Sequence, residues 1–238
     1  MNGADWQVAV GAETVSASYE PSTTGADSAV FVFAHGAGGN MSDRGMLASA
    51  NALRDAGLGI VRFNFVYKEN KSGRPDAMPK LMDTVRAVVE RTRAELGRPR
   101  PLVIGGRSMG GRAASMLAAG GFDAGGLLLL AYPLHPSGQP EKLRDAHLPR
   151  IRMPVLAFSG TRDTLCTREL MERALTSVVA PWEMHWIDGA NHSFHVLKSS
   201  GTTDAAVMAE IGATSRQWVG NLSHKAESSC AVHSSSPY

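Results

Sequence analysis

The sequence lacks the features that mark several broad classes of protein. Its 238 residues contain no apolar run close to the roughly 20 residues that a membrane-spanning helix requires. The two cysteines, Cys166 and Cys230, do not have the spacing of metal ligands. The formal net charge is only +2, so neither a nucleic acid nor an anionic membrane is an expected partner.

Targeting and cofactor motifs are also missing. The first residues, MNGADWQVAV, have no basic segment followed by an apolar core, so we expect no signal peptide. We therefore predict a cytoplasmic protein, with a disulfide between the two cysteines left open as an alternative. There is no zinc-type ligand cluster and no phosphate-binding loop, so the sequence predicts neither a metal nor an organic cofactor.

What the chain does contain is an alternation of short apolar runs and helical patterns. Such runs suit strands buried on both faces, so the alternation predicts a doubly wound, mostly parallel α/β sheet. The expected strands are residues 29–34, 59–65, 101–106, 127–132, 154–160 and 182–187, and the expected helices are residues 44–56, 79–96, 109–119, 167–178 and 204–219. Residues 6–19 alternate around a central turn and predict an antiparallel hairpin at the sheet edge.

The domain organisation follows from composition. No internal repeat or interdomain linker is evident, so we expect one domain over residues 1–222. Residues 223–238 are serine-rich and are expected to form a disordered tail. Residues 133–150, between two expected strands, are polar and proline-rich and too short for a large lid domain.

One glycine-rich segment stands at the carboxyl end of the strand at 101–106, where sheets of this type bind ligands. Residues 106–110 read Gly-Arg-Ser-Met-Gly, the G-x-S-x-G pattern of a nucleophile elbow. A side chain at Gly106 or Gly110 would collide with the neighbouring strand or helix. The pattern makes Ser108 the candidate nucleophile and the amide of Met109 a candidate oxyanion donor.

The partners of such a serine are expected after later strands. Asp163 follows the strand at 154–160, and His192 follows the strand at 182–187. The order Ser108, Asp163, His192 predicts a Ser-His-Asp triad. Among the alternatives, Asp188 is expected to cap a turn, and His195 is expected to line the site.

A second glycine-rich turn, HGAGG at residues 35–39, follows the strand at 29–34. We expect its Ala37 amide to be the second oxyanion donor, with Gly38 as the alternative. His35 is expected to hold this turn by hydrogen bonds. Arg107 and Tyr67 are candidate substrate-binding residues.

The segment at 66–78 is also expected to face the carboxyl ends of the strands. It carries Lys68, Lys71 and Arg74. Either these charges are solvated, or they favour a substrate with an anionic group.

Five segments carry a resemblance to a known family; they are FAHGAGGNM (33–41), VRFNFVYKENKSGRPD (61–76), GGRSMGGR (105–112), SGTRD (159–163) and GANHSF (189–194). Over roughly residues 28–220 the sequence resembles the α/β-hydrolases of the dienelactone-hydrolase-like group. It is especially similar to the branch containing a testis-expressed hydrolase-like protein and the third subunit of a chromatin acetyltransferase complex. The group implies a serine or cysteine nucleophile. Dienelactone hydrolase itself uses cysteine, so dienelactone is not the expected substrate.

The resulting expectation is a serine hydrolase with a small-molecule ester as its substrate. Short acyl groups are favoured, because the chain carries no apolar lid. The alternative is a hydrolase-fold protein that serves as an interaction module, since a fold alone does not fix a function. The sequence does not specify an oligomeric state.

Overall fold

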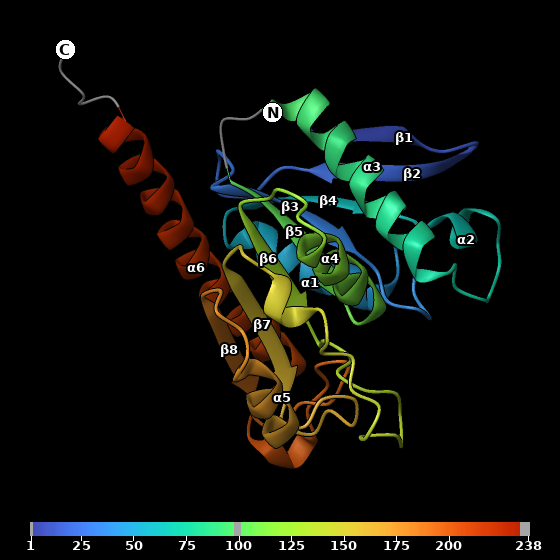
Figure 1. Ribbon diagram of the computed structural model, residues 1–238, viewed down its shortest axis with the longest axis vertical. Helices are drawn as coiled ribbons and strands as arrows, with labels where there is room; N and C mark the ends of the chain where they lie inside the picture. Colours follow the sequence, from blue (N-terminus) through green and yellow to red (C-terminus); the bar gives the residue numbers. More distant parts are fainter. Residues whose placement is uncertain (1, 98–100, 234–238) are drawn as a thin grey trace.

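The structure is a computed structural model that describes residues 2–97 and 101–233, with side chains described as far as residue 222 (Figure 1). Eight strands form one sheet in the order β1-β2-β4-β3-β5-β6-β7-β8. Their bounds are β1 (Ala4–Val10), β2 (Glu13–Glu20), β3 (Ala29–Ala34), β4 (Leu58–Phe63), β5 (Leu102–Arg107), β6 (Gly126–Leu130), β7 (Val155–Gly160) and β8 (Trp182–Ile187). This sheet confirms the predicted doubly wound, mostly parallel arrangement.

The N-terminal hairpin lies at one edge of the sheet. Strand β2 pairs in an antiparallel manner with both β1 and β4. The remaining neighbours, from β4 through β3 and β5 to β8, all pair in parallel. The turn between β1 and β2 contains Gly11 at φ 60°, a conformation that glycine adopts without steric cost. The hairpin predicted over residues 6–19 is therefore confirmed.

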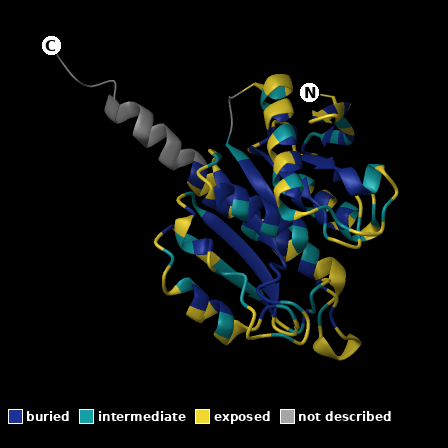
Figure 2. Ribbon diagram, turned by 45° about the vertical axis from the view of Figure 1, so that its right-hand side comes forward, coloured by how far each residue is buried: buried dark blue, intermediate teal, exposed yellow. Residues whose placement is uncertain are grey.

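Helices cover both faces of the sheet (Figure 1). Helices α1 (Arg44–Asp55) and α6 (Asp204–His233) pack together on one face, and α3 (Met78–Leu96) and α4 (Met109–Ala119) pack together on the other. Helix α5 (Arg168–Leu175) joins the second group. The central strands are consequently buried on both sides, as Figure 2 shows in dark blue. In β3, for example, Phe31 and Phe33 face α1 and α6, and Val30 and Val32 face α3 and α4.

The ends of the elements reflect local capping and composition. Asp43 caps α1 by accepting a 2.9 Å hydrogen bond from the Met46 amide. Helix α6 continues to His233, through residues that the sequence predicted as part of a disordered tail. That stretch contains Lys, Ala and Glu, which are good helix formers. Residues 234–238 lie outside the described residues.

The connections at the carboxyl end of the sheet are short. A one-turn helix, α2 (Val66–Glu69), which the sequence did not predict, follows β4. Residues 133–150 contain a single 3₁₀ turn, η1 (Leu148–Arg150), and a second 3₁₀ turn, η2 (Lys198–Ser200), precedes α6. No helical cap is built from the 133–150 connection, so this end of the sheet is open.

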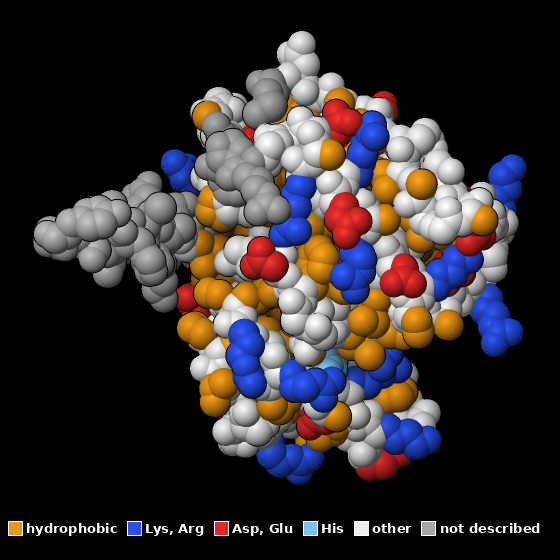
Figure 3. Space-filling view, turned by 45° about the horizontal axis from the view of Figure 1, so that its top comes forward, with side chains coloured by type: hydrophobic (Ala, Val, Ile, Leu, Met, Phe, Trp, Pro, Cys, Tyr) orange, Lys and Arg blue, Asp and Glu red, His pale blue; other side chains and the backbone are white. Residues whose placement is uncertain are grey.

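Two further features are the distribution of surface charge and the hydropathy of the helices. On the face shown in Figure 3, Lys and Arg side chains are interspersed with Asp and Glu. Among the described residues, no helix has the length and hydropathy needed to cross a bilayer.

Candidate active site

Ser108 stands at a strained turn between β5 and α4. Its backbone has φ 50° and ψ −117°, a conformation that costs free energy for a residue other than glycine. The Ser108 amide donates a 2.9 Å hydrogen bond to the carbonyl oxygen of Leu130, which ties the turn to the end of β6. The turn therefore holds the serine side chain at the head of α4, as the predicted elbow requires.

Two glycines make this turn possible. A Cβ atom at Gly110 would lie 2.6 Å from the carbonyl oxygens of both Ala34 and His35. A Cβ atom at Gly106 would lie 2.5 Å from the Ala34 oxygen. Because these neighbours are backbone atoms, they cannot swing aside, and the predicted collision is borne out at both positions.

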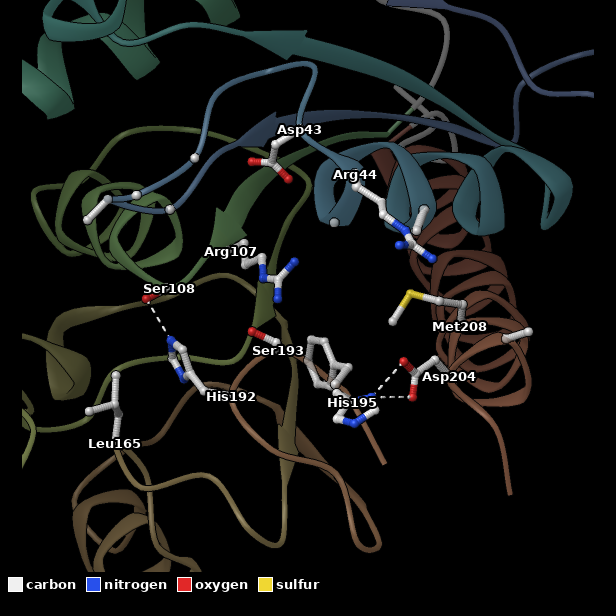
Figure 4. Close-up of a pocket in the computed structure, with 18 residues that line it drawn as sticks. Asp43, Arg44, Arg107, Ser108, Leu165, His192, Ser193, His195, Asp204 and Met208 are labelled. Carbon is white, nitrogen blue, oxygen red and sulfur yellow. Dashed lines mark hydrogen bonds and ion pairs between the residues drawn. The ribbon is translucent and has the colours of Figure 1, made fainter. Parts of the chain in front are cut away.

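A continuous chain of hydrogen bonds joins three side chains from distant parts of the sequence. The Nε2 atom of His192 lies 2.9 Å from the Oγ atom of Ser108 (Figure 4). The Nδ1 atom of His192 lies 2.8 Å from the Oδ2 atom of Asp163. An ionised Asp163 only accepts hydrogen bonds, so Nδ1 carries the proton and Nε2 is left to accept from the serine hydroxyl. The structure thus brings together all three residues of the predicted triad.

The loops that carry Asp163 and His192 are held against each other. A Cβ atom at Gly160 would collide with the carbonyl group of Ala190, so the end of β7 can reach the His192 loop only because residue 160 is glycine. The Arg162 amide then donates a 2.9 Å hydrogen bond to the Ala190 oxygen. The Asp163 side chain has no exposed surface, and its Oδ1 atom accepts a 2.8 Å hydrogen bond from the Leu165 amide. The carboxylate is therefore fixed in one orientation beneath the imidazole.

His35 holds the glycine-rich turn at residues 35–39 by hydrogen bonds, as the sequence predicts. The ring is fully buried, and its Nε2 atom accepts a 3.1 Å hydrogen bond from the Phe65 amide. The Nδ1 atom consequently carries the proton and donates a 2.8 Å hydrogen bond to the Gly36 oxygen. Burial lowers the pKa of His35, so the ring stays neutral and this pair of hydrogen bonds persists.

Backbone amides surround the space in front of the serine. The Met109 amide belongs to the first turn of α4 and has no acceptor within that helix. The glycine-rich turn lies directly against the elbow, since a Cβ atom at Gly36 would stand 3.6 Å from that of Ser108. Ala37 and Gly38 both line the cleft beside Ser108, so the two alternatives for the second oxyanion donor both occupy its wall.

The cleft has a volume of about 1150 Å³ and lies between the elbow, α1 and the start of α6. It is lined by the turn at 36–39, the start of α1 at 43–45 and 48, Arg107, Ser108, Leu165, the loop at 192–195 and α6 at 204, 205 and 208. Arg107 and His195 thus occupy the cleft, as the sequence predicts for them. Lys68, Lys71 and Arg74 are not among its lining residues, which supports the solvated alternative for the segment at 66–78.

Tyr67, the other candidate substrate-binding residue, lies behind the glycine-rich turn instead of in the cleft. Its side chain is 2 % exposed, and its hydroxyl donates a 2.8 Å hydrogen bond to the Ala37 oxygen. Burial raises the pKa of Tyr67 to about 12, so the hydroxyl keeps its proton. The unforeseen α2 turn packs the ring inward, which explains the difference.

Several residues of the cleft were not predicted from the sequence. Asp43 and Arg44 enter from the start of α1, and Asp204 enters from α6, where it bonds to His195 at 2.9 Å. Asp43 carried a usable signal, because an aspartate directly before an expected helix is a typical N-cap. No local pattern indicates that Arg44 or Asp204 faces the cleft.

Other polar groups near the site are not part of the hydrogen-bonded chain that joins Ser108, His192 and Asp163. The exposed Asp188 accepts a 3.1 Å hydrogen bond from the Thr161 hydroxyl, in keeping with its expected position in a turn. Cys166 is a buried free thiol whose pKa is raised to about 12 by burial. Within the described residues, no group of three or more His, Cys, Asp or Glu side chains could hold a metal ion.

Comparison with known proteins agrees with the fold of the chain. Similar solved structures include a serine hydrolase without lid from Xanthomonas campestris, with a TM-score of 0.72 and 22% identity over 92% of this chain and 95% of that chain. Dienelactone hydrolase from Anabaena variabilis has a TM-score of 0.69 and 19% identity over 93% and 99% of the two chains. Est1E from Butyrivibrio proteoclasticus, solved with ferulic acid, has a TM-score of 0.71 and 15% identity over 90% and 99%. Residues 27–220 match the family described as an alpha/beta hydrolase domain, and the chain therefore belongs to that family.

Proposed function

We propose that this protein is a serine hydrolase that cleaves carboxylic esters through an acyl-enzyme intermediate. The observation that carries the proposal is the hydrogen-bonded chain from Ser108 through His192 to Asp163, with Ser108 facing an open cleft. A side chain with a free hydroxyl is a weak nucleophile, and an adjacent imidazole base is the usual way to activate it.

In this proposal, His192 Nε2 takes the proton of Ser108 as Oγ attacks the ester carbonyl. The amides of Met109 and Ala37 donate hydrogen bonds to the oxygen of the tetrahedral intermediate. His192 then gives the proton to the leaving alcohol. A water molecule, deprotonated in turn by His192, attacks the acyl-enzyme and releases the acid.

Asp163 positions His192 and stabilises its positive charge in these steps. It holds the tautomer in which Nε2 can accept the serine proton, and it stabilises the imidazolium that follows. Its full burial and its hydrogen bond from the Leu165 amide keep the carboxylate directed at His192. In this proposal, residues of the chain and one water molecule carry out all of these steps.

We further propose a small ester with a short acyl group as the substrate, in a cytoplasmic setting. The open cleft without a helical cap supports the first part, because a long acyl chain would keep much of its surface in water. The structural neighbours include an esterase domain from Rhodothermus marinus, and this supports ester cleavage without identifying the ester. The similarity to the testis-expressed hydrolase-like branch stays a prediction.

The test is labelling with a fluorophosphonate, which reacts with an activated serine, followed by intact-mass and peptide mass spectrometry. We expect one adduct on Ser108 and none in Ser108→Ala. Ser193 provides a matched control, because it lines the same cleft beside His192 but is outside the hydrogen-bonded chain. Ser193→Ala should label like the wild type. Labelling at another residue would refute the assignment of Ser108, and no labelling together with no ester hydrolysis would favour the alternative of an interaction module.

A further inference from the structure

The cleft contains an arginine whose charge is not neutralised by a bonded partner. Arg107 is partly buried next to Ser108, and its guanidinium lies against the backbone of α1, where a Cβ atom at Gly45 would collide with Nη1. Within the part of the chain that the structure describes, this guanidinium forms neither an ion pair nor a side-chain hydrogen bond. A partly desolvated cation without a bonded acceptor is costly, so the site favours an external anion.

The carboxylates of the cleft are already engaged with other donors. The two oxygens of Asp43 accept hydrogen bonds from the amides of Met46 and Asn40, at 2.9 and 3.1 Å. Asp204 accepts from His195 at 2.9 Å and from the Val196 amide at 2.9 Å. Arg107 thus has a Coulombic attraction to Asp43 but forms no ion pair with it.

A second cation faces the same space. Arg44 lines the cleft from the first position of α1 and forms no ion pair among the described residues, although its charge attracts the Asp204 carboxylate. In Figure 4, both guanidinium groups point into the cleft, and Arg107 lies between Ser108 and Arg44 in this view. A group bound at Arg107 would therefore sit close to the reacting serine and within reach of a second positive charge.

We propose that Arg107, with Arg44 beyond it, binds a carboxylate on the ester substrate, so that the physiological substrate is an anionic ester. The inference rests on the proposed function, since it names the substrate class of the same site. A planar guanidinium presents paired N–H groups that match the two oxygens of a carboxylate. Arg107 recognises the charge at short range, and the more exposed Arg44 attracts it at longer range.

The test compares kcat/KM for two matched pairs of esters at low and high salt. One pair places the charge on the acyl side: mono-(p-nitrophenyl) adipate against its methyl ester. The other places it on the leaving group: 4-acetoxybenzoate against its methyl ester. The ratio of charged to neutral ester, taken within each variant, isolates the charge effect from any general loss of activity.

For the wild type we expect the charged ester to be preferred about tenfold or more in at least one pair, in line with a hydrogen bond to a charged group. Arg107→Gln should bring that ratio to about one, and Arg107→Lys, which keeps the charge without the fork, should leave it intermediate. Arg44→Gln should lower the ratio and its dependence on salt. The matched control is Arg74→Gln, which removes the same charge outside the cleft and should leave the ratio unchanged.

Equal rates for both members of both pairs, in a wild type that is labelled on Ser108, would overturn this inference and leave the proposed function standing. An undiminished ratio in both Arg107 variants would also overturn it. If none of the four esters is hydrolysed and Ser108 is not labelled, the proposed function fails and this inference fails with it.

Discussion

The hydroxyl of Tyr67 donates a 2.8 Å hydrogen bond to the carbonyl oxygen of Ala37, the residue whose amide is the candidate oxyanion donor. His35 bonds to the preceding carbonyl, of Gly36, at 2.8 Å. Both side chains are buried, and both bond to the turn from the side opposite the cleft. The His35 bond orients the Gly36–Ala37 peptide, which carries the Ala37 N–H, and the Tyr67 bond orients the Ala37–Gly38 peptide, which carries the Gly38 N–H. Both candidate oxyanion donors are thus oriented by side chains that do not line the cleft, which is how a preorganised oxyanion site is supported.

Tyr67→Phe should therefore reduce kcat more than it changes KM. The loss of one such hydrogen bond is worth about 1 kcal/mol, or about fivefold in rate if the peptide loses its orientation in the transition state. The measurement is steady-state kinetics with p-nitrophenyl acetate. Tyr132→Phe is the control, because Tyr132 also donates a buried hydrogen bond, at 2.6 Å to the Arg144 oxygen, but does not contact the turn. A similar fall of kcat in both variants would point to general destabilisation instead of positioning.

The proposed triad should behave as a unit. We expect His192→Ala to lower kcat about as much as Ser108→Ala does, by a factor on the order of 10⁶, and the double variant to lose little more. Asp163→Asn should also be strongly impaired, because the amide no longer fixes the tautomer of His192. Asp188→Asn, in the loop that carries His192 but bonded to Thr161, should retain nearly full activity. Wild-type activity in Asp163→Asn would contradict the assignment of the acid.

Gly110→Ala should disrupt the elbow itself. The added methyl group would stand 2.6 Å from the oxygens of Ala34 and His35, so strand β3 or helix α4 must move. We expect a loss of about 1–3 kcal/mol in the free energy of unfolding, as for an overpacked core, together with a loss of activity. Gly220→Ala is the matched control, because that exposed glycine of α6 has no atom within 4 Å of an added Cβ. It should be neutral or stabilising by up to about 1 kcal/mol. Equal effects of the two substitutions on urea unfolding would refute the steric argument.

The elements that were predicted well from the sequence carry local signals. Strand β3 was predicted at residues 29–34, its observed bounds, because six consecutive apolar residues are flanked by polar ones. Ser108 was found because its elbow needs glycines at fixed positions, and those glycines are visible without any tertiary information. Asp163 and His192 were found because each follows an apolar strand pattern, and the carboxyl ends of parallel strands lie at the same edge of the sheet.

The charged lining of the cleft could not be predicted in the same way. Arg44 looks like any polar residue at the start of an amphipathic helix, and it reaches the cleft only because α1 packs beside α6. Tyr67 was misplaced because a single helical turn, α2, rotates its ring behind the oxyanion turn, and a four-residue helix leaves no periodic pattern. Both cases depend on how elements pack, which neither composition nor spacing records.

A buried histidine away from the cleft should make the protein less stable in mild acid. His147 is 7 % exposed and bonds to the Ser115 hydroxyl at 2.8 Å, and burial, with Arg112 and Arg150, lowers its pKa to about 4. In the unfolded chain the pKa is about 6.5, so the unfolded state binds the proton first as the pH falls. The stability that depends on neutral His147 is complete above about pH 6.5 and is lost as the pH falls toward 4. Buried His35, whose pKa is also lowered, acts in the same direction.

The free energy of unfolding should therefore fall by about 2 kcal/mol between pH 7 and pH 5 through His147 alone. Urea unfolding at the two pH values measures the difference. His147→Gln removes this proton-binding group, so its stability should change less between the same two pH values, even if the variant is less stable at both. An equal change in the variant and the wild type would show that His147 is not responsible.

Substrate length should follow from the open end of the sheet. Beyond Ser108, the walls of the cleft come from short loops and the starts of α1 and α6, and the 133–150 connection adds only the turn η1. Each methylene that is buried in an apolar wall gains about 0.8 kcal/mol, whereas a methylene left in water gains nothing. The kcat/KM of p-nitrophenyl esters should accordingly be highest at acetate or butyrate and should not rise through octanoate to palmitate. Met208 is an apolar residue at the far wall, and Met208→Ala should leave the acetate value unchanged if short acyl groups end before it. A maximum at octanoate, lowered selectively by Met208→Ala, would instead place the acyl chain along α6 and would refute a preference for short esters.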